Sequence, residues 1–177
     1  ITSLALYDNN SKKYCCLILD PSKKIEPIID DYKEVVPYAT EKELLLGFLA
    51  KWYELDPTIV TGWNSVFFDI PYLYYRIRNT LGELAANSLS PINKIKINPP
   101  YSEQPINIGG IGHLDYMLLF KKFIVKQEPS YRLGDIGTKY VKLGKLEYDG
   151  SLDVLFNEDI DKFIEYNIRD VEIIVEL

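Results

Sequence analysis

The sequence predicts an α/β domain, in which strands and helices alternate along the chain. Two observations support this fold class. Strand-like runs flank a group of turn-forming residues near the start, and apolar residues recur at helical spacing in several later segments. The length of 177 residues suits one domain and is sufficient to bury a hydrophobic core.

The chain is expected to begin with a β-hairpin over Ile1–Leu19. Its two strand-like runs are Thr2–Tyr7 and Tyr14–Leu19. Between them lies Asp8–Ser11, which consists of aspartate, asparagine and serine, residue types that favour tight turns.

A helix, a strand and a second helix are expected to follow. Thr40 and Glu43 have the spacing of a capping box, which indicates a helix start. Pro57 ends this helix, Thr58–Thr61 is predicted to be a short buried strand, and the second helix should run from about Pro71 to Leu81. The first helix has a core face of apolar residues at helical spacing: Leu45, Phe48, Leu49 and Trp52.

The segment Asn87–Gly112 has no regular pattern and ends in a glycine-rich stretch. We expect a long protruding or functional loop, which could contain a small hairpin. Regular structure resumes at Leu114–Phe123, and helices are expected over Leu133–Tyr140 and from about Asp159 to the end of the chain. The irregular segment contains four prolines: Pro91, Pro99, Pro100 and Pro105.

Charge and composition exclude some classes of protein. The net charge of −6 argues against a protein that coats DNA, because neutralising phosphates requires a basic face. It does not exclude an enzyme that uses metal ions and holds only a strand end. No apolar run approaches the roughly 20 residues of a membrane helix, so no membrane partner is expected. Cys15 and Cys16 are adjacent in a predicted strand, where they would bridge poorly, which favours a reducing, intracellular setting.

The last predicted helix carries the sharpest local signal, at Asp170. An apolar stripe on this helix contains Ile160, Ile164, Ile168, Val171 and Val175. The residues three, four and seven positions from Asp170 are all uncharged, so this carboxylate faces the protein instead of the charged side. Such a carboxylate is costly unless it is paired, and a metal ion is a natural partner. The alternative is an aspartate at the edge of a crevice that bonds to backbone amides.

Tyr166 lies four residues before Asp170, on the same side of the predicted helix. Its hydroxyl could orient a water held by a metal ion. The alternative is a core tyrosine, and since the chain has 14 tyrosines, this residue type means little by itself.

Asp69 is the second candidate. It follows a predicted strand and a glycine turn in the sequence Thr-Gly-Trp-Asn-Ser-Val-Phe-Phe-Asp, which begins at Thr61. One interpretation is a helix N-cap, with Pro71 tolerated in the first turn. The other is a ligand-binding carboxylate, since α/β enzymes bind ligands beyond the carboxyl ends of buried strands.

Two of these motifs resemble motifs of the 3′–5′ exonuclease domain of family B DNA polymerases. The Thr-Gly-Trp-Asn-x3-Phe-Asp that ends at Asp69 is similar to the second exonuclease motif, and Tyr166-x3-Asp170 is similar to the third. Ile1–Leu4 resembles the strand that follows the first motif, so the similarity covers essentially all 177 residues. Further segments resemble the T-even phage branch, in the same order: Leu114–Tyr116, Phe120–Phe123, Pro129–Leu133 and Leu143–Gly150.

The resemblance implies an RNase H-like mixed sheet flanked by helices, with four metal-binding carboxylates. Asp69 and Asp170 match two of them. By the same resemblance, Tyr166 would help to place the attacking water, which is the tyrosine variant of the DEDD superfamily. Lys145 would lie near the phosphate as a supporting cation.

The implied reaction is removal of the terminal nucleotide from a single-stranded 3′ end of DNA, which is proofreading in the parent polymerase. The implied cofactor is Mg²⁺ or Mn²⁺, with two ions in the intact site, because two ions can stabilise both the attacking and the leaving oxygen. Asn64 and Phe68 would shape the pocket for the terminal nucleotide, and aromatic side chains can stack on unpaired bases. The implied partners are that DNA end and the remaining polymerase domains.

The first exonuclease motif, an Asp-x-Glu on a central strand, is absent from the chain. We therefore expect residues 1–177 to be a partial exonuclease domain, cut before the first motif and inside or just after the last helix, and inactive in isolation. Without that strand, the hairpin over Ile1–Leu19 should pair directly with Thr58–Thr61, or a second copy should fill the gap by self-association through an open edge. An open gap is the less favoured outcome.

Two other functions remain open at this point. One is a catalytically silent DNA-binding or structural module of the same fold, and the other is a stand-alone DEDD nuclease of RNA. The combined presence of Asp69, Lys145, Tyr166 and Asp170 favours the enzyme lineage, whose setting would be intracellular, in the host cytoplasm for a phage protein. If the chain belongs to the enzyme lineage, Asp69 and Asp170 should face each other across one acidic cleft lined by Tyr166. His113 falls outside every motif and is interpreted as structural.

Overall fold

The computed structural model describes residues 1–99, 101–124 and 126–177, and it has mixed α/β structure. The chain packs as two compact units. The first unit consists of Ile1–Leu44 and Pro129–Leu177, and the second consists of Leu45–Glu128. Pro100, part of the predicted irregular loop, lies outside the described residues.

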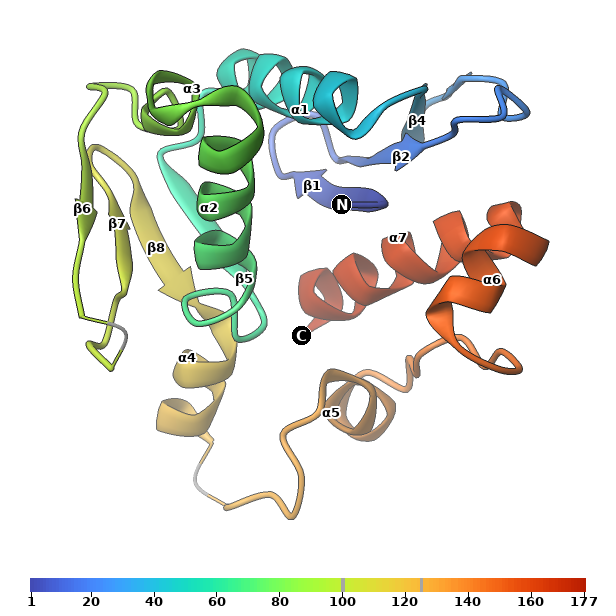
Figure 1. Ribbon diagram of the computed structural model, residues 1–177. Helices are drawn as coiled ribbons and strands as arrows, with labels where there is room; N and C mark the ends of the chain where they lie inside the picture. Colours follow the sequence, from blue (N-terminus) through green and yellow to red (C-terminus); the bar gives the residue numbers. More distant parts are fainter. Residues whose placement is uncertain (100, 125) are drawn as a thin grey trace. The chain divides into compact units, whose positions relative to one another are not determined.

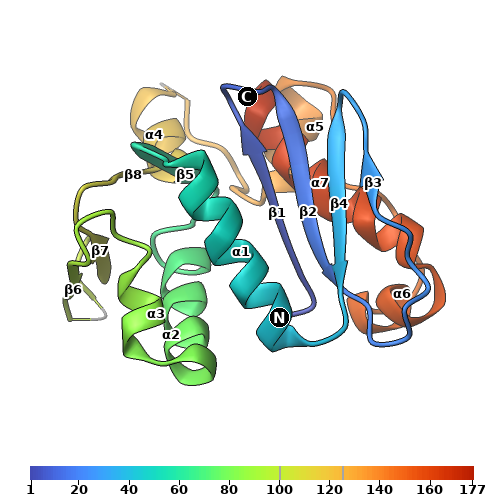
Figure 2. The same cartoon turned by 90° about the horizontal axis from the view of Figure 1, so that it is seen from above.

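The first unit contains a sheet with the strand order β1-β2-β4-β3 (Figure 2). The predicted hairpin is confirmed: β1 (Ser3–Asp8) is antiparallel to β2 (Lys13–Leu19), with Asp8 opposite Lys13. The other two strands, β3 (Ile28–Ile29) and β4 (Lys33–Tyr38), were not predicted. β4 runs parallel to β2 and antiparallel to β3.

Helix α7 (Ile160–Glu176) contacts β1 and β2, and Figure 2 shows it on one face of the sheet. The side chain of Asp159 caps its first turn by accepting a hydrogen bond from Lys162 N at 3.0 Å. The apolar stripe is buried at Ile164 and Ile168, whereas Val175, near the end of the helix, is 40% exposed. The core between α7 and the sheet includes Cys16, Ile18, Val35, Ile164 and Ile168.

Two shorter helices pack against α7. The predicted helix over Leu133–Tyr140 is confirmed as α5, and α6 (Leu152–Glu158) precedes α7 directly. The segment between α5 and α6 has no helix or strand. It carries Lys145 past α7, which positions the candidate site.

Helix α1 (Glu41–Leu55) begins with the predicted capping box. Thr40 N donates to Glu43 Oε2 at 3.0 Å, and Glu43 N donates to Thr40 Oγ1 at 3.2 Å. Leu45 and Phe48 are buried on the predicted core face. The helix ends two residues before Pro57, as expected.

The second unit contains two small sheets beside helices (Figure 1). Strand β5 (Ile59–Gly62) is parallel to β8 (Gly112–Asp115), and α4 (Tyr116–Phe123) follows β8 directly. The small hairpin suggested for the irregular segment is confirmed by β6 (Ile95–Ile97) and β7 (Ile106–Ile108). The remaining helices of this unit are α2 (Asp69–Leu81) and α3 (Glu83–Asn87), which pack against each other.

Two expectations for the strand at Thr58–Thr61 are wrong. It is not buried, because Ile59 is 61% exposed and β5 pairs only with β8 in the part of the chain that the structure describes. It also does not pair with the N-terminal hairpin, because β1 and β5 belong to different sheets. β1 is instead held by its six-pair register with β2 and by α7, where Ser3 Oγ donates to Asn167 Oδ1 at 2.8 Å. Self-association through an open edge stays a prediction.

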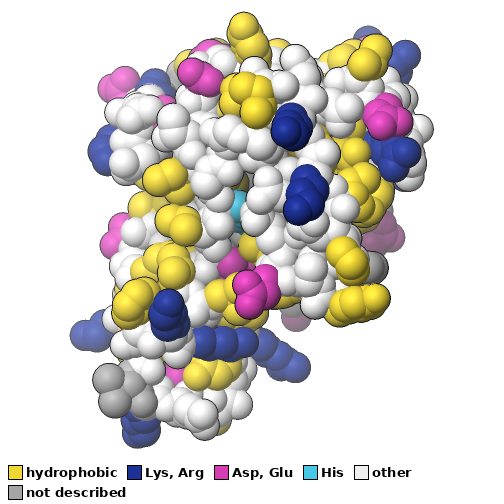
Figure 3. All heavy atoms as spheres, turned by 90° about the vertical axis from the view of Figure 1, so that its left-hand side faces the viewer, with side chains coloured by type: hydrophobic (Ala, Val, Ile, Leu, Met, Phe, Trp, Pro, Cys, Tyr) yellow, Lys and Arg dark blue, Asp and Glu magenta, His cyan; other side chains and the backbone are white. Residues whose placement is uncertain are grey.

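The surface of the molecule retains many apolar side chains. Figure 3 shows one face on which exposed hydrophobic side chains lie between lysine and arginine side chains. Among the residues with described structure, no helix is both long enough and apolar enough to span a membrane.

The packing of α5 against α7 gives a stability prediction at Gly137. A Cβ added there would lie within 2.5 Å of Ile173 Cγ2 and would also collide with the carbonyl oxygen of Leu143. Gly137→Ala should therefore lower the free energy of unfolding by about 1–3 kcal/mol, despite the higher helix propensity of alanine. Chemical denaturation of the two proteins measures this difference.

Gly112→Ala is the matched control, because its nearest contact, Ile59 Cγ1 at 3.6 Å, is an ordinary van der Waals distance. It should change the free energy of unfolding by no more than about 0.5 kcal/mol. Equal effects of the two substitutions would contradict the close packing at Gly137.

Candidate active site

In the first unit, the side chains of Lys145, Tyr166 and Asp170 form one cluster. Lys145 Nζ donates to Asp170 Oδ2 at 2.8 Å and to Tyr166 OH at 3.1 Å. The same ammonium lies 5.2 Å from the centroid of the Tyr166 ring, within the range of a cation–π interaction. The structure thus groups three of the residues that the sequence analysis selected.

The two oxygens of Asp170 have different surroundings. Oδ2 accepts the hydrogen bond from Lys145, whereas Oδ1 is buried and has no hydrogen-bond partner among the residues that the structure describes. Buried polar atoms are rarely left in this state, so an orphaned carboxylate oxygen requires an explanation. It has the charge and the oxygen chemistry that a divalent cation such as Mg²⁺ prefers.

Helix α7 determines how Tyr166 and Asp170 are presented. They are four residues apart and therefore lie on one side of the helix, as the sequence predicts. The ring of Tyr148 packs edge-to-face on Tyr166, with centroids 5.3 Å apart. Asn167 ties the same turn to β1 by accepting from Ser3 Oγ, and its Nδ2 donates to Phe163 O at 2.7 Å.

Lys145 only partly offsets the effect of burial on the pKa of Asp170. Burial raises the pKa of Asp170, and the hydrogen bond and charge of Lys145 offset only part of this rise. For Lys145, burial lowers the pKa, but its bonds to Asp170 and Tyr166 outweigh that effect and raise it. One lysine therefore does not fully stabilise the Asp170 carboxylate, which would gain from a further cation.

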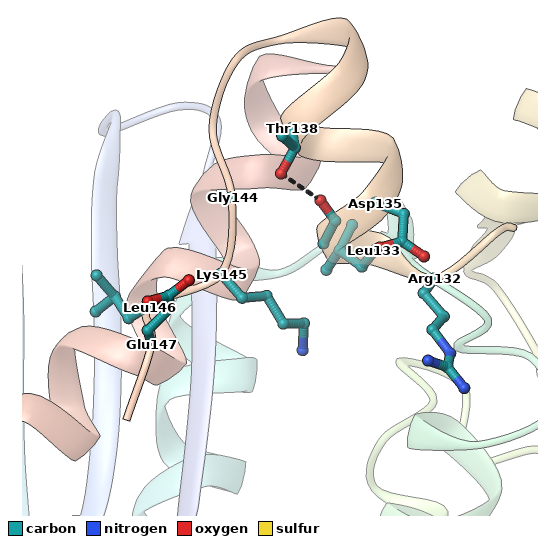
Figure 4. Close-up of a pocket in the computed structure, with 9 residues that line it drawn as sticks. Arg132, Leu133, Asp135, Thr138, Gly144, Lys145, Leu146 and Glu147 are labelled. Carbon is teal, nitrogen blue, oxygen red and sulfur yellow. Dashed lines mark hydrogen bonds between the residues drawn. The ribbon is translucent and has the colours of Figure 1, made fainter. Parts of the chain in front are cut away.

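A pocket of about 720 Å³ adjoins Lys145 (Figure 4). In Figure 4 the side chains of Arg132 and Lys145 both extend downward, from opposite sides of the pocket. A Cβ at Gly134 would lie 3.1 Å from Lys145 Cγ, so the glycine leaves room for the lysine stem. The lining residues are Arg132, Leu133, Gly134, Asp135, Thr138, Gly144, Lys145, Leu146 and Glu147.

In the second unit, Asp69 is the first residue of α2. It does not cap the helix: the cap residue is Phe68, which makes no capping side-chain bond, so the N-cap interpretation of Asp69 is wrong. Asp69 is exposed to solvent, yet the protein atoms around it raise the pKa of its carboxyl group. The negative charge of Asp115 adds to this rise.

The loop that leads to Asp69 is built on backbone hydrogen bonds. Asn64 has a positive φ of 61°, and its carbonyl accepts from Phe68 N at 3.1 Å. Ser65 O accepts from Ile70 N at 3.0 Å, so the loop closes directly onto the first turn of α2. Asn64 is half-buried and Phe68 is 66% exposed.

Asp115 holds this loop from the side and was not selected from the sequence. Its side chain is 4% exposed, Oδ2 accepts from Val66 N at 3.0 Å, and Oδ1 accepts from Leu118 N at 3.2 Å, which caps α4. His113 Nε2 lies 2.9 Å from Ser65 Oγ and braces the same loop. The signal for Asp115 was its position between a strand and a helix, the N-cap pattern.

Asp69 and Asp170 lie in different units, and the expectation that they line one acidic cleft stays a prediction. Across residues 1–99, 101–124 and 126–177, no group of three or more acidic, histidine or cysteine side chains could hold a metal ion.

The pairing of Lys145 with Asp170 gives a prediction about acidity. Lys145→Gln should raise the pKa of Asp170 further, because burial remains while the lysine's hydrogen bond and charge are lost. Nuclear magnetic resonance titration of the Asp170 carboxyl carbon measures this pKa. The control Lys162→Gln, which removes a lysine charge from the first turn of α7 instead, should leave it unchanged. An unchanged or lower pKa in Lys145→Gln would contradict the pairing.

Comparison with known proteins identifies the family. A model of the exonuclease domain of family B DNA polymerases matches residues 3–136. The chain is 40% identical over 161 residues to the DNA-directed DNA polymerase of Escherichia phage RB69, a match that covers 89% of this chain and 17% of that protein. For the polymerase of Enterobacteria phage T4, identity is 37% over 141 residues, covering 77% of this chain and 16% of that protein.

A more distant relative is DNA polymerase 1 of Sulfurisphaera ohwakuensis, 29% identical over 196 residues that cover 100% of this chain and 19% of that protein. The chain spans about one sixth of the length of the two phage polymerases. The chain belongs to the family of exonuclease domains of family B DNA polymerases, and its similarity to the phage enzymes supports a place in the T4-like branch.

Proposed function

We propose that these residues act in the 3′–5′ proofreading exonuclease of a DNA-directed DNA polymerase, which hydrolyses the terminal nucleotide of a single-stranded 3′ end. The observation that carries the proposal is the Lys145–Tyr166–Asp170 cluster in a chain of this family. The cluster supplies a fixed cation, a hydroxyl and a carboxylate with one orphaned oxygen. The remaining polymerase domains would be its partners within the parent protein.

Asp69 and Asp170 are proposed as ligands of divalent Mg²⁺ or Mn²⁺. Asp170 fits this role because Oδ1 is buried and finds no partner within residues 1–99, 101–124 and 126–177, and Asp69 fits because its carboxylate is not used as a helix cap. Two bound ions would stabilise the attacking and the leaving oxygen of the displacement. The Asp-x-Glu pair of the family would complete the ligand set, on a central strand of an RNase H-like sheet.

Tyr166 is proposed to position the attacking water. Its oxygen accepts a hydrogen bond from Lys145, so its own hydroxyl proton can be donated to a water molecule. Lys145 is proposed to offset the negative charge that develops on the phosphate, because its ammonium group is already fixed by two partners. A fixed cation loses little conformational freedom when the substrate binds.

Asn64 and Phe68 are proposed to shape the pocket for the terminal nucleotide. Both lie in the loop that ends at Asp69, and the backbone of Asn64 holds Phe68 in place. The exposed ring of Phe68 offers a face on which a base of any sequence can stack. This matches a reaction that must accept every mismatched nucleotide.

The second candidate function is a catalytically silent DNA-binding or structural module. It is favoured by the lack of a complete ligand group among the described residues. The two functions predict different rates of DNA hydrolysis for a protein that contains the Asp-x-Glu strand in addition to residues 1–177. An exonuclease would then hydrolyse single-stranded DNA with Mg²⁺ or Mn²⁺ far faster than residues 1–177 alone, whereas a silent module would not respond.

Mutation of Asp170 tests the proposed function. In the full-length protein, Asp170→Ala should lower the rate of 3′–5′ hydrolysis of single-stranded DNA by roughly 10²–10³-fold or more, because the charge that develops on the phosphate is no longer stabilised. The measurement is release of nucleoside monophosphate from a labelled 3′ end. Asp161→Ala, which removes a carboxylate from the first turn of α7, should retain full activity. Undiminished hydrolysis by Asp170→Ala would overturn the proposal.

A further inference from the structure

The outer face of α2 carries three exposed aromatic side chains. Phe68, at the cap position, is 66% exposed, Tyr72 is 54% exposed and Tyr75 is 42% exposed. They follow each other at intervals of four and three residues, so they lie in one row along the helix. We call these three residues the aromatic row.

The aromatic row lies opposite the buried face of α2. The buried residues of the helix are Ile70, Leu73, Tyr74 and Ile77. The core therefore already has its apolar contacts, and the row is not needed to fold the helix. Adjacent exposed aromatic side chains on a soluble protein mark a binding surface more often than scattered single ones do.

The rings of the row make defined contacts with neighbouring rings. Those of Phe68 and Tyr72 are nearly parallel, with an interplanar angle of 7° and centroids 6.4 Å apart. The ring of Tyr75 packs edge-on against buried Tyr74, with centroids 5.3 Å apart, which limits its motion. Tyr75 lies seven residue steps beyond Phe68, a rise of about 10 Å along the helix, which corresponds to about three stacked bases at 3.4 Å each.

The charge of this face suits a nucleic acid. After Asp69, the charged residues of α2 are Arg76 and Arg78, both basic, although the whole chain has a net charge of −6. Arg78 forms an ion pair with Glu83 at 3.6 Å, so the basic character of this face is attributed to Arg76. Arg76 is exposed and directly follows Tyr75 on the helix surface. The row is also continuous with the candidate site, because Phe68 immediately precedes Asp69.

We propose that the aromatic row binds the unpaired bases next to the terminal nucleotide of a single-stranded DNA end, by stacking on Tyr72 and Tyr75. Stacking is tolerant of sequence, because every base has a π-face, whereas a duplex keeps its bases stacked on each other. The proposal rests on the proposed function for the identity of the ligand. It adds to that function a surface along α2 that selects a frayed strand over a duplex.

Substitution of both tyrosines tests the proposal in the full-length protein, in an Asp170→Ala background that keeps the DNA intact. Tyr72→Ala with Tyr75→Ala should weaken binding of a short single-stranded oligonucleotide by roughly fivefold or more for each tyrosine. Tyr72→Phe with Tyr75→Phe should restore binding, because stacking needs the ring and not the hydroxyl. The control Tyr53→Ala, which removes a tyrosine on α1 that is 85% exposed, should bind like the parent protein. Equal binding by the double alanine variant and this control would overturn the proposal.

Photo-cross-linking locates the contact independently of hydrolysis. Oligonucleotides with 5-iodouracil at the second or third position from the 3′ end should form adducts on Tyr72 or Tyr75, identified by mass spectrometry, and a matching blunt duplex should form few. Adducts only elsewhere would overturn the proposal and point to a protein partner for the row. If Asp170→Ala retained hydrolysis while these adducts formed, the proposed function would fail and the DNA-binding surface would stand.

Discussion

A carboxylate that is shielded from water needs a cation or hydrogen-bond donors to stay charged, and this constraint organises both units of the chain. Asp115 meets it completely, since each of its oxygens accepts from a backbone N–H. Asp170 meets it only in part, because Lys145 donates to one oxygen and the other has no partner in the described part of the chain. The first carboxylate fixes a loop and a helix, and the second is left with the capacity to bind something else. This difference in hydrogen bonding distinguishes Asp115 from Asp170, the proposed metal ligand.

The surrounding structure serves to hold these groups in place. α7 is anchored to the sheet by Ile164 and Ile168 and to β1 through Asn167, so that Tyr166 and Asp170 project from a rigid helix. In the other unit, Asp115 and His113 brace the loop before Asp69 from β8. Both proposed metal ligands are therefore presented by helices whose positions depend on buried contacts, which is the arrangement that preorganised sites require.

Much of this could be predicted from the sequence wherever the signal is local. Spacing over a few residues predicts the capping box at Thr40 and the hairpin turn. It also predicts that Asp170 lies on the uncharged side of α7. The contact of Lys145 with Asp170 spans 25 residues and is not predicted from the sequence, because the family resemblance places Lys145 only near the phosphate. The sequence does not predict β3 and β4. β3 has only two residues, and β4 contains Pro37, a residue type that argues against a strand. An apolar strand pattern predicts burial, so the pattern does not predict the exposure of Ile59.

We propose that Asp69 and Asp170 bind two metal ions of one site, and anomalous diffraction from Mn²⁺ can locate those ions. The crystals would contain the chain together with the Asp-x-Glu strand and a short single-stranded oligonucleotide. We expect two manganese peaks about 3.5–4 Å apart, with Asp170 bound to one ion and Asp69 at the other. Manganese bound at neither carboxylate, or Asp69 and Asp170 found at separate places with no ion between them, would contradict it.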